Sequence, residues 1–186
     1  GAEKESKGKK YANNTGRKGS SVEITTALSL AVNAGDGVGG EGAAAVGILQ
    51  NDLSASVQNS TITVDTLNAW AASNALLINV AAGTSISGGS FSGAGSASAQ
   101  YTSNTTQAAV DDSKIQAASA AVNAASSDLN VNVAGQVSAG KNGAGLAVAF
   151  NHQNNTTGTY MRGSTLNSRS DDGFTALSLT AENKGQ

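Results

Sequence analysis

The sequence of 186 residues contains no cysteine and no proline, and it has a single histidine. Without cysteine there is no disulfide framework and no thiolate metal site, and one histidine excludes a site with several imidazole ligands. Aromatic residues make up 4% of the chain and charged residues 13%. Disordered linkers are usually rich in proline or charge. The composition therefore indicates an ordered chain with small side chains, and its 23 glycines indicate many tight turns.

Charge is unevenly distributed along the chain. Residues 1–18 carry six basic and two acidic side chains (6 − 2 = +4), and the other 168 residues carry five and eleven (5 − 11 = −6). We predict a basic flexible tail, or a partial preceding coil, over residues 1–20, and a repeat segment over residues 21–186. No second basic patch extends the tail, so a solvated tail is favoured over contact with nucleic acid.

Two sequence markers recur with a period near 50 residues. The first is an alternating apolar segment, "LSLAV" from Leu28, "LLINV" from Leu76, "LNVNV" from Leu129 and "LSLTA" from Leu177. The second runs from an asparagine to an aliphatic residue, as in "NDLSASVQNSTI" from Asn51, "NTTQAAVDDSKI" from Asn104 and "NTTGTYMRGSTL" from Asn155. Differences in length fall in the glycine-rich stretches between the two markers, where a solenoid places its variable loops.

Short alternating runs, each followed by Gly, Asn, Asp or Ser, predict β-strands separated by turns. About five or six such strands fit into one period. We therefore predict an all-β fold, a right-handed parallel β-helix in which each repeat of about 50 residues forms two coils of three short strands. Asn51, Asn104 and Asn155 are expected to contribute to amide ladders, two coils apart from one another.

The stretch "AGDGVGGEG" from Ala34 to Gly42 contains the G-x-G-x-x-G spacing of a dinucleotide-binding turn. That turn requires a helix opened by its last glycine. Here the following "AAAVGI" aligns with "SASAQY" and "AVAFNH" of the other repeats, in which small residues alternate as in strands. We predict strand and not a phosphate-binding loop.

The units "NDLSASVQNSTI" and "NTTQAAVDDSKI", with "GAGLAVAF"-type segments between them, resemble repeats of giant bacterial surface exoproteins. They look most like leukotoxin-type and adhesin-type passengers of autotransporter (type V) secretion. The resemblance implies a β-helical segment of a longer passenger that is exported across the outer membrane and displayed on the cell surface or released. Its implied partners are neighbouring repeats of the same chain and an unknown component of the host-cell surface or extracellular matrix, without membrane insertion by this segment.

Signals of catalysis are weak, and we predict no catalytic, cofactor-binding or metal-binding residue. His152 is predicted in a polar surface turn, and no G-x-S-x-G elbow surrounds any serine. The pairs Asp111–Asp112 and Asp171–Asp172 do not recur between repeats and are expected to be solvated turn acids. A β-helical polysaccharide lyase or hydrolase is the enzymatic alternative, and a pure spacer is the structural one.

Aromatic residues mark the predicted partner surface. Alternation in "LNAWAAS" places Leu67, Ala69 and Ala71 on one face and Trp70 on the other. If the first face is internal, Trp70 is exposed for stacking, unless the long glycine-rich loop covers it. The related positions in the other repeats that could extend this surface are Tyr101, Phe150 and Tyr160.

Overall fold

The computed structural model describes residues 12–33, 37–168 and 176–185, and this part of the chain is all-β and contains no helix. Residues 12–20, where we predicted a tail or a partial coil, form the first part of strand β1, whereas residues 1–11 lie outside the described residues. The strands are β1 (Ala12–Asn33), β2 (Val38–Gln58), β3 (Thr61–Thr63), β4 (Thr66–Ser87), β5 (Phe91–Asp111), β6 (Lys114–Gln116), β7 (Ser119–Ala139), β8 (Gly143–Arg162), β9 (Thr165–Asn167) and β10 (Ala176–Gly185).

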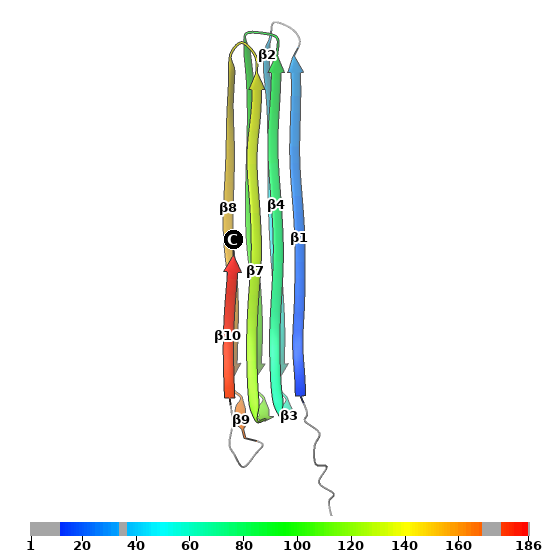
Figure 1. The fold of residues 1–186 in the computed structure, drawn as a ribbon, viewed down its shortest axis with the longest axis vertical. Coiled ribbons are helices and arrows are strands. Elements are labelled where there is room, and N and C mark those ends of the chain that lie inside the picture. Colours follow the sequence, from blue (N-terminus) through cyan, green and yellow to red (C-terminus); the bar gives the residue numbers. More distant parts are fainter. Residues whose placement is uncertain (1–11, 34–36, 169–175, 186) are drawn as a thin grey trace, which may run out of the picture.

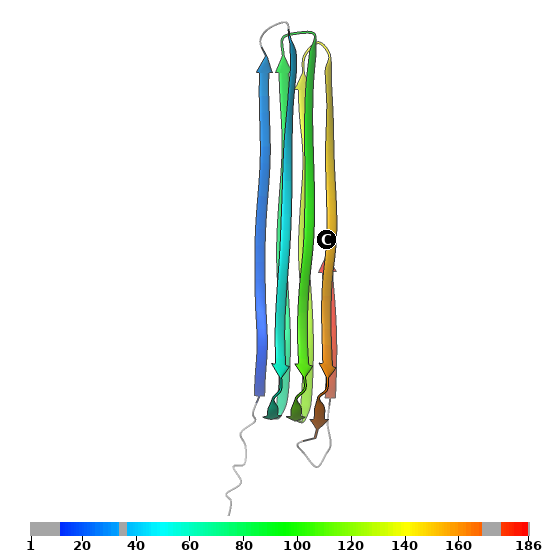
Figure 2. The ribbon, with the colours of Figure 1, turned by 180° about the vertical axis from the view of Figure 1, so that it is seen from behind.

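The strands form three parallel sheets. The front sheet has the order β1-β4-β7-β10, the rear sheet β2-β5-β8 and the short sheet β3-β6-β9. The chain ascends in the front sheet, crosses to the rear sheet, descends, passes through the short sheet and begins again one strand along (Figure 1). Seen from behind, the descending strands β2, β5 and β8 lie nearest the viewer (Figure 2). This winding is right-handed, and the predicted parallel β-helix is confirmed.

Each repeat forms one coil, so the predicted two coils per repeat are wrong. Asn51 pairs directly with Asn104, and Asn104 with Asn155, on neighbouring strands. The long strands have 20 to 22 residues and at about 3.3 Å per residue extend for roughly 70 Å. Asn, Ser and Gly lie within these strands, where the sequence pattern had indicated turns. The longest dimension of the molecule therefore follows the strands and not the stack of coils (Figure 1).

The register follows the second sequence marker throughout. Ile62 pairs with Ile115 and Ile115 with Leu166, at the offsets expected from the sequence. The first marker follows the register at only one step, because Leu76 pairs with Leu129 but Leu28 pairs with Ala82. The pairing offset changes at the turns after β1, β4 and β7, as predicted for the variable loops, and it also changes between β9 and β10, from 51 (Lys114↔Thr165) to 57 (Ser119↔Ala176).

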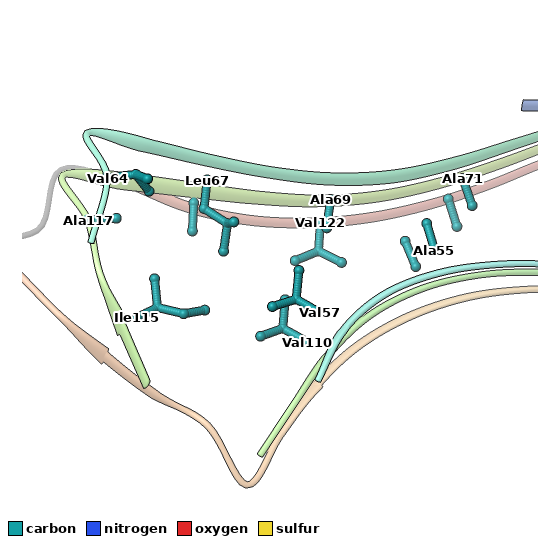
Figure 3. Close-up of a cluster of buried hydrophobic side chains, with 13 residues drawn as sticks. Ala55, Val57, Val64, Leu67, Ala69, Ala71, Val110, Ile115, Ala117 and Val122 are labelled. Carbon is teal, nitrogen blue, oxygen red and sulfur yellow. The ribbon is translucent and has the colours of Figure 1, made fainter. Parts of the chain in front are cut away.

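An apolar cluster fills the end of the coil that the short sheet closes. There the front and rear sheets diverge and the short sheet forms a third side, with Ile115 opposite Leu67 and Val110 (Figure 3). Leu67, Val110, Val122 and Ile115 are at most 1% exposed. Burial of one such aliphatic side chain contributes about 1.5–3 kcal/mol. This cluster is the largest apolar core of the described residues.

A ladder of serines fixes the turn between the rear and short sheets. The backbone N–H of Ser60 donates to Oγ of Ser113 (3.2 Å), and the N–H of Ser113 donates to Oγ of Ser164 (3.0 Å). Each hydroxyl in turn donates to the carbonyl two residues earlier, for example Ser113 Oγ to Asp111 O at 2.8 Å. The residue before each serine has a positive φ, 48° at Asn59, 45° at Asp112 and 59° at Gly163. Asn, Asp and Gly are the residues that adopt this conformation most readily.

We expect Ser113→Ala to lower the free energy of unfolding by about 1–3 kcal/mol, because it removes the acceptor for the Ser60 N–H and the donor to Asp111 O. Urea unfolding followed by circular dichroism measures the change, with Ser56→Ala on the exposed outer face of β2 as the matched control. Equal midpoints for the two variants would contradict the ladder.

Candidate partner surface

The two halves of each long coil have opposite polarity. In the half next to the short sheet, inward residues are apolar, as at Leu67, Ala69 and Ala71. In the other half, here called the far half, most inward residues are polar or small, as at Asn79 and Ser85. Leu49 and Leu77 are exceptions and form a small apolar cluster with Ala75. Because side chains alternate along an uninterrupted strand, the other large apolar residues of the far half point outward. The far half is therefore mostly polar inside and apolar outside.

Side-chain amides span the narrow interior of the far half. Asn79 Nδ2 of the front sheet donates to the carbonyl oxygens of Ala45 (3.2 Å) and Ala99 (2.6 Å) in the rear sheet. Gln100 Nε2 of the rear sheet donates to the carbonyls of Leu77 (3.2 Å) and Val131 (2.7 Å) in the front sheet. Buried amides are stable only when they are hydrogen-bonded. These bonds therefore help to hold the two sheets together where the apolar cluster is small, formed by Leu49, Ala75 and Leu77.

Asn51, Asn104 and Asn155 stack in register on adjacent strands, not two coils apart, but the predicted amide ladder does not form, because the side-chain amide of Asn104 has no hydrogen-bond partner among the described residues. Asn155 Oδ1 accepts from the backbone N–H of Asn104 (3.2 Å), and Asn51 Oδ1 accepts from Ser21 Oγ (2.8 Å). Asn155 Nδ2 also donates to Oδ2 of Asp128 (2.5 Å), which is 2% exposed. The bonds to Ser21 and Asp128 thus cross the interior at the boundary between the two halves.

The outer face of the front sheet carries an apolar band in the far half. We call it the front band, and it extends along β1 from Val22 to Val32, along β4 from Leu76 to Ile86 and along β7 from Leu129 to Ala139. Its members fall in rows across the sheet, such as Val22–Leu76–Leu129 and Ile24–Ile78–Val131. Nine large aliphatic side chains of the band are 43% to 74% exposed, Val22, Ile24, Leu28, Leu30, Val32, Ile86, Leu129, Val133 and Val137.

The outer face of the rear sheet carries a second band, the rear band, which extends along β2 from Val38 to Ile48, along β5 from Phe91 to Tyr101 and along β8 from Ala144 to His152 and contains aromatic rings. Tyr101 stacks on His152 with ring centroids 5.2 Å apart, and Phe150, two residues before His152, is 60% exposed. Further along the same outer face, toward the turns that join the front and rear sheets, lies a shallow apolar hollow of ≈ 520 Å³. Its floor contains Gly40, on β2, and Gly93, on β5, and it is flanked by Phe91 and Leu146. Tyr101 and Phe150 are therefore the two predicted partner residues that the fold brings together.

Trp70 lies on the outer face of the front sheet, opposite the internal Leu67, Ala69 and Ala71, as the alternation predicted. Its ring covers Gly16 of β1, where an added Cβ would lie 2.0 Å from the indole. Trp70 is consequently half-buried, and its cover is a neighbouring strand and not the glycine-rich loop, which lies at the other end of the coil. Trp70 is on the face of the molecule opposite Tyr101 and Phe150.

Tyr160 lies on the rear sheet near its short-sheet end, eight residues after His152 along β8, and is separate from the aromatic group of the rear band. The guanidinium of Arg162 lies 5.8 Å from the centroid of the Tyr160 ring. Arg162 also forms a bidentate ion pair with Asp111 (Nε–Oδ1 3.0 Å, Nη2–Oδ2 2.8 Å). Hydrogen bonding to Arg162 lowers the pKa of the Asp111 carboxyl below its usual value.

The other chemical candidates are dispersed. His152 lies on strand β8, so its predicted place in a turn is wrong; Tyr101 pairs with it across the strands. Asp112 is an exposed turn residue, as expected, and Asp171–Asp172 lies outside the described residues. No group of three or more metal-ligating His, Asp or Glu side chains occurs within the described ranges. Nor does this part of the chain contain a helix that is long and apolar enough to cross a membrane.

The glycine motif is part of a strand. Gly37 lies in the turn before β2, Gly40 lies on β2, and Gly35 falls outside the described residues. The segment "AAAVGI" continues β2 and pairs with "SASAQY" of β5, which pairs with "AVAFNH" of β8. No helix opens here, and the predicted strand is confirmed.

Aromatic residues alone did not reveal the aliphatic front band. The signal that could have revealed it is the alternation of inward and outward side chains along a strand. If Leu67, Ala69 and Ala71 point inward and the strand continues without a break, then Leu76, Ile78 and Val80 must point outward. The prediction of short strands separated by turns concealed this continuity.

Comparison with known proteins gives no further assignment. No family model, no curated protein and no solved structure matches the chain.

We expect Arg162→Gln to return the pKa of Asp111 toward its ordinary value of 3.8. Because the folded-state pKa of Asp111 is lowered, the ion pair stabilises the fold above that ordinary value, and the contribution is lost as pH falls through the lowered pKa. Carbon-13 NMR titration of the Asp111 carboxyl in both proteins measures the shift. An identical titration in the variant would show that the ion pair does not form in solution.

Proposed function

We propose that the chain is a non-enzymatic β-solenoid segment of a secreted or surface-displayed bacterial exoprotein, and that it acts in host-cell adhesion as a stalk with a binding face. The bacterial surface setting comes from the resemblance of the repeats to autotransporter passengers. The observation that carries the binding role is the exposed group of Tyr101, His152 and Phe150 on the rear band.

A rigid sheet suits such a surface. Tyr101 and His152 are fixed by strand pairing, so little conformational freedom is lost when a partner covers them. Aromatic side chains are enriched among the residues that dominate binding energy. The hollow over Gly40 and Gly93, further along the same outer face, is apolar and open, as expected of a site for an apolar side chain of a host protein. The partner we propose is therefore a protein component of the host-cell surface or matrix.

The enzymatic alternative receives little support from the geometry. A lyase or hydrolase needs a free acid and a free base together on one face. On the outer face of the rear sheet, the acid nearest to a basic group is Asp111, and its charge is neutralised by the ion pair with Arg162. We accordingly retain adhesion as the proposal. A binding test distinguishes it from the structural alternative, a pure spacer.

We expect the fragment to bind cultured epithelial cells or immobilised laminin or fibronectin, and we expect Tyr101→Ser with Phe150→Ser to weaken that binding at least about tenfold. Flow cytometry and surface plasmon resonance provide the measurements. Gln107→Ala, on the outer face of the same strand as Tyr101, is the matched control and is expected to bind normally. Binding that is absent in all proteins, or equal in all of them, would favour a spacer.

A further inference from the structure

We propose that the front band is a self-association surface, on which a second copy of this chain packs face to face through its own front band. The proposal does not depend on host binding. It rests on the size of the band, on the flatness of the sheet and on the open strand edges beside it.

The front band is larger than an ordinary exposed apolar patch. It covers eleven residue positions on each of three strands, from Val22↔Leu76 to Val32↔Ile86 and on to β7. At about 3.3 Å per residue and about 4.8 Å between strands, this is roughly 500 Å² of flat area. Two such faces together bury about 1,000 Å² of surface, which is the lower limit of buried area for a specific interface. The branched side chains raise the buried area above this value, which counts the face as flat.

The shape of the front sheet suits an identical face. Its long strands lie nearly straight and side by side (Figure 1), and flat sheets are usually stabilised by stacking on another sheet. The rows that begin at Val22 and Ile24 form ridges across the strands, whereas the row that begins at Leu28 falls to the small residues Ala82 and Gly135 and forms a furrow beside Leu28. A ridge of one copy can enter the furrow of another at the usual sheet separation of about 10 Å.

The rear band is less suited to pairing with itself. The hollow of ≈ 520 Å³ over Gly40 and Gly93 occupies the end of the rear band next to the turns, so two rear bands would meet hollow against hollow there. The hollow on the front face, at the row of Val22, Leu76 and Leu129, is smaller, ≈ 250 Å³.

A lipid bilayer is the competing occupant. The band is about 33 Å long, close to the hydrocarbon thickness of about 30 Å. However, β1 and β8 are the outer strands of their sheets, and each has one edge without a neighbouring strand among the described residues. Unpaired backbone groups at a sheet edge are not tolerated in lipid. A second copy covers the band and leaves these edges in water.

The test is the mass of the fragment in solution, from multi-angle light scattering and sedimentation velocity between about 1 μM and about 100 μM. We expect a dimer in this range, and we expect Leu28→Lys with Val133→Lys to raise its dissociation constant at least about tenfold. The matched control is Val46→Lys with Val148→Lys, which introduces the same charges on the rear band and is expected to leave the dimer unchanged. If circular dichroism shows that the lysine variant of the front band is unfolded, Leu28→Thr with Val133→Thr takes its place.

Three results would overturn the proposal. The first is a monomer at every concentration. The second is dissociation caused by the rear-band variant but not by the front-band variant. The third is a monomer that binds phosphatidylcholine vesicles through the front band, shown by loss of vesicle binding in the front-band variant, which would assign the band to lipid.

Discussion

Every feature of this fold depends on the register in which one coil lies on the next. Parallel strands about 4.8 Å apart place each residue beside its counterpart one repeat later, so Asn104 lies between Asn51 and Asn155, and Ser113 lies between Ser60 and Ser164. A change of one residue within a strand would exchange its inner and outer faces. Changes in repeat length are for that reason confined to the turns, where they do not alter the alternation.

The same register determines the surface. The front and rear sheets of the far half are close enough for Asn79 and Gln100 each to reach carbonyls of the opposite sheet. An interior this narrow is filled mostly by amides, hydroxyls and small side chains, with Leu49 and Leu77 as exceptions, and the alternation directs the other large aliphatic side chains of this half outward. Near the short sheet the coil widens, and Leu67, Val110 and Ile115 can pack inside. A single strand such as β4 thus contributes to an apolar core at one end and to an apolar surface at the other.

The sequence was sufficient to predict the class of fold but not the dimensions of its coil. The offset shared by Ile62, Ile115 and Leu166 reflects the true register, because a polar turn and an apolar core residue are both required at that place in every coil. Strand length was not predictable from apolar periodicity, because the inner face of β4 changes after Leu77 to residues such as Asn79 and Ser85. From that point inner and outer positions still alternate, but the inner ones are no longer the more hydrophobic, so the pattern resembled short strands separated by turns. Trp70 was placed on the correct face, whereas its cover, Gly16, comes from a strand whose register the sequence did not reveal.

The central claim is that one repeat is one coil, and a pair of introduced cysteines tests it most directly in this cysteine-free chain. Gln50 and Ser103 are partners on the outer faces of β2 and β5. If one repeat is one coil, their Cα atoms are about 5 Å apart, and Gln50→Cys with Ser103→Cys closes a disulfide under mild oxidation. Gln50→Cys with Thr105→Cys, displaced by two residues along β5, is predicted to remain reduced. With two coils per repeat, the Gln50 and Ser103 positions would be about 10 Å apart, and failure of their cysteines to crosslink in the folded chain would contradict the account.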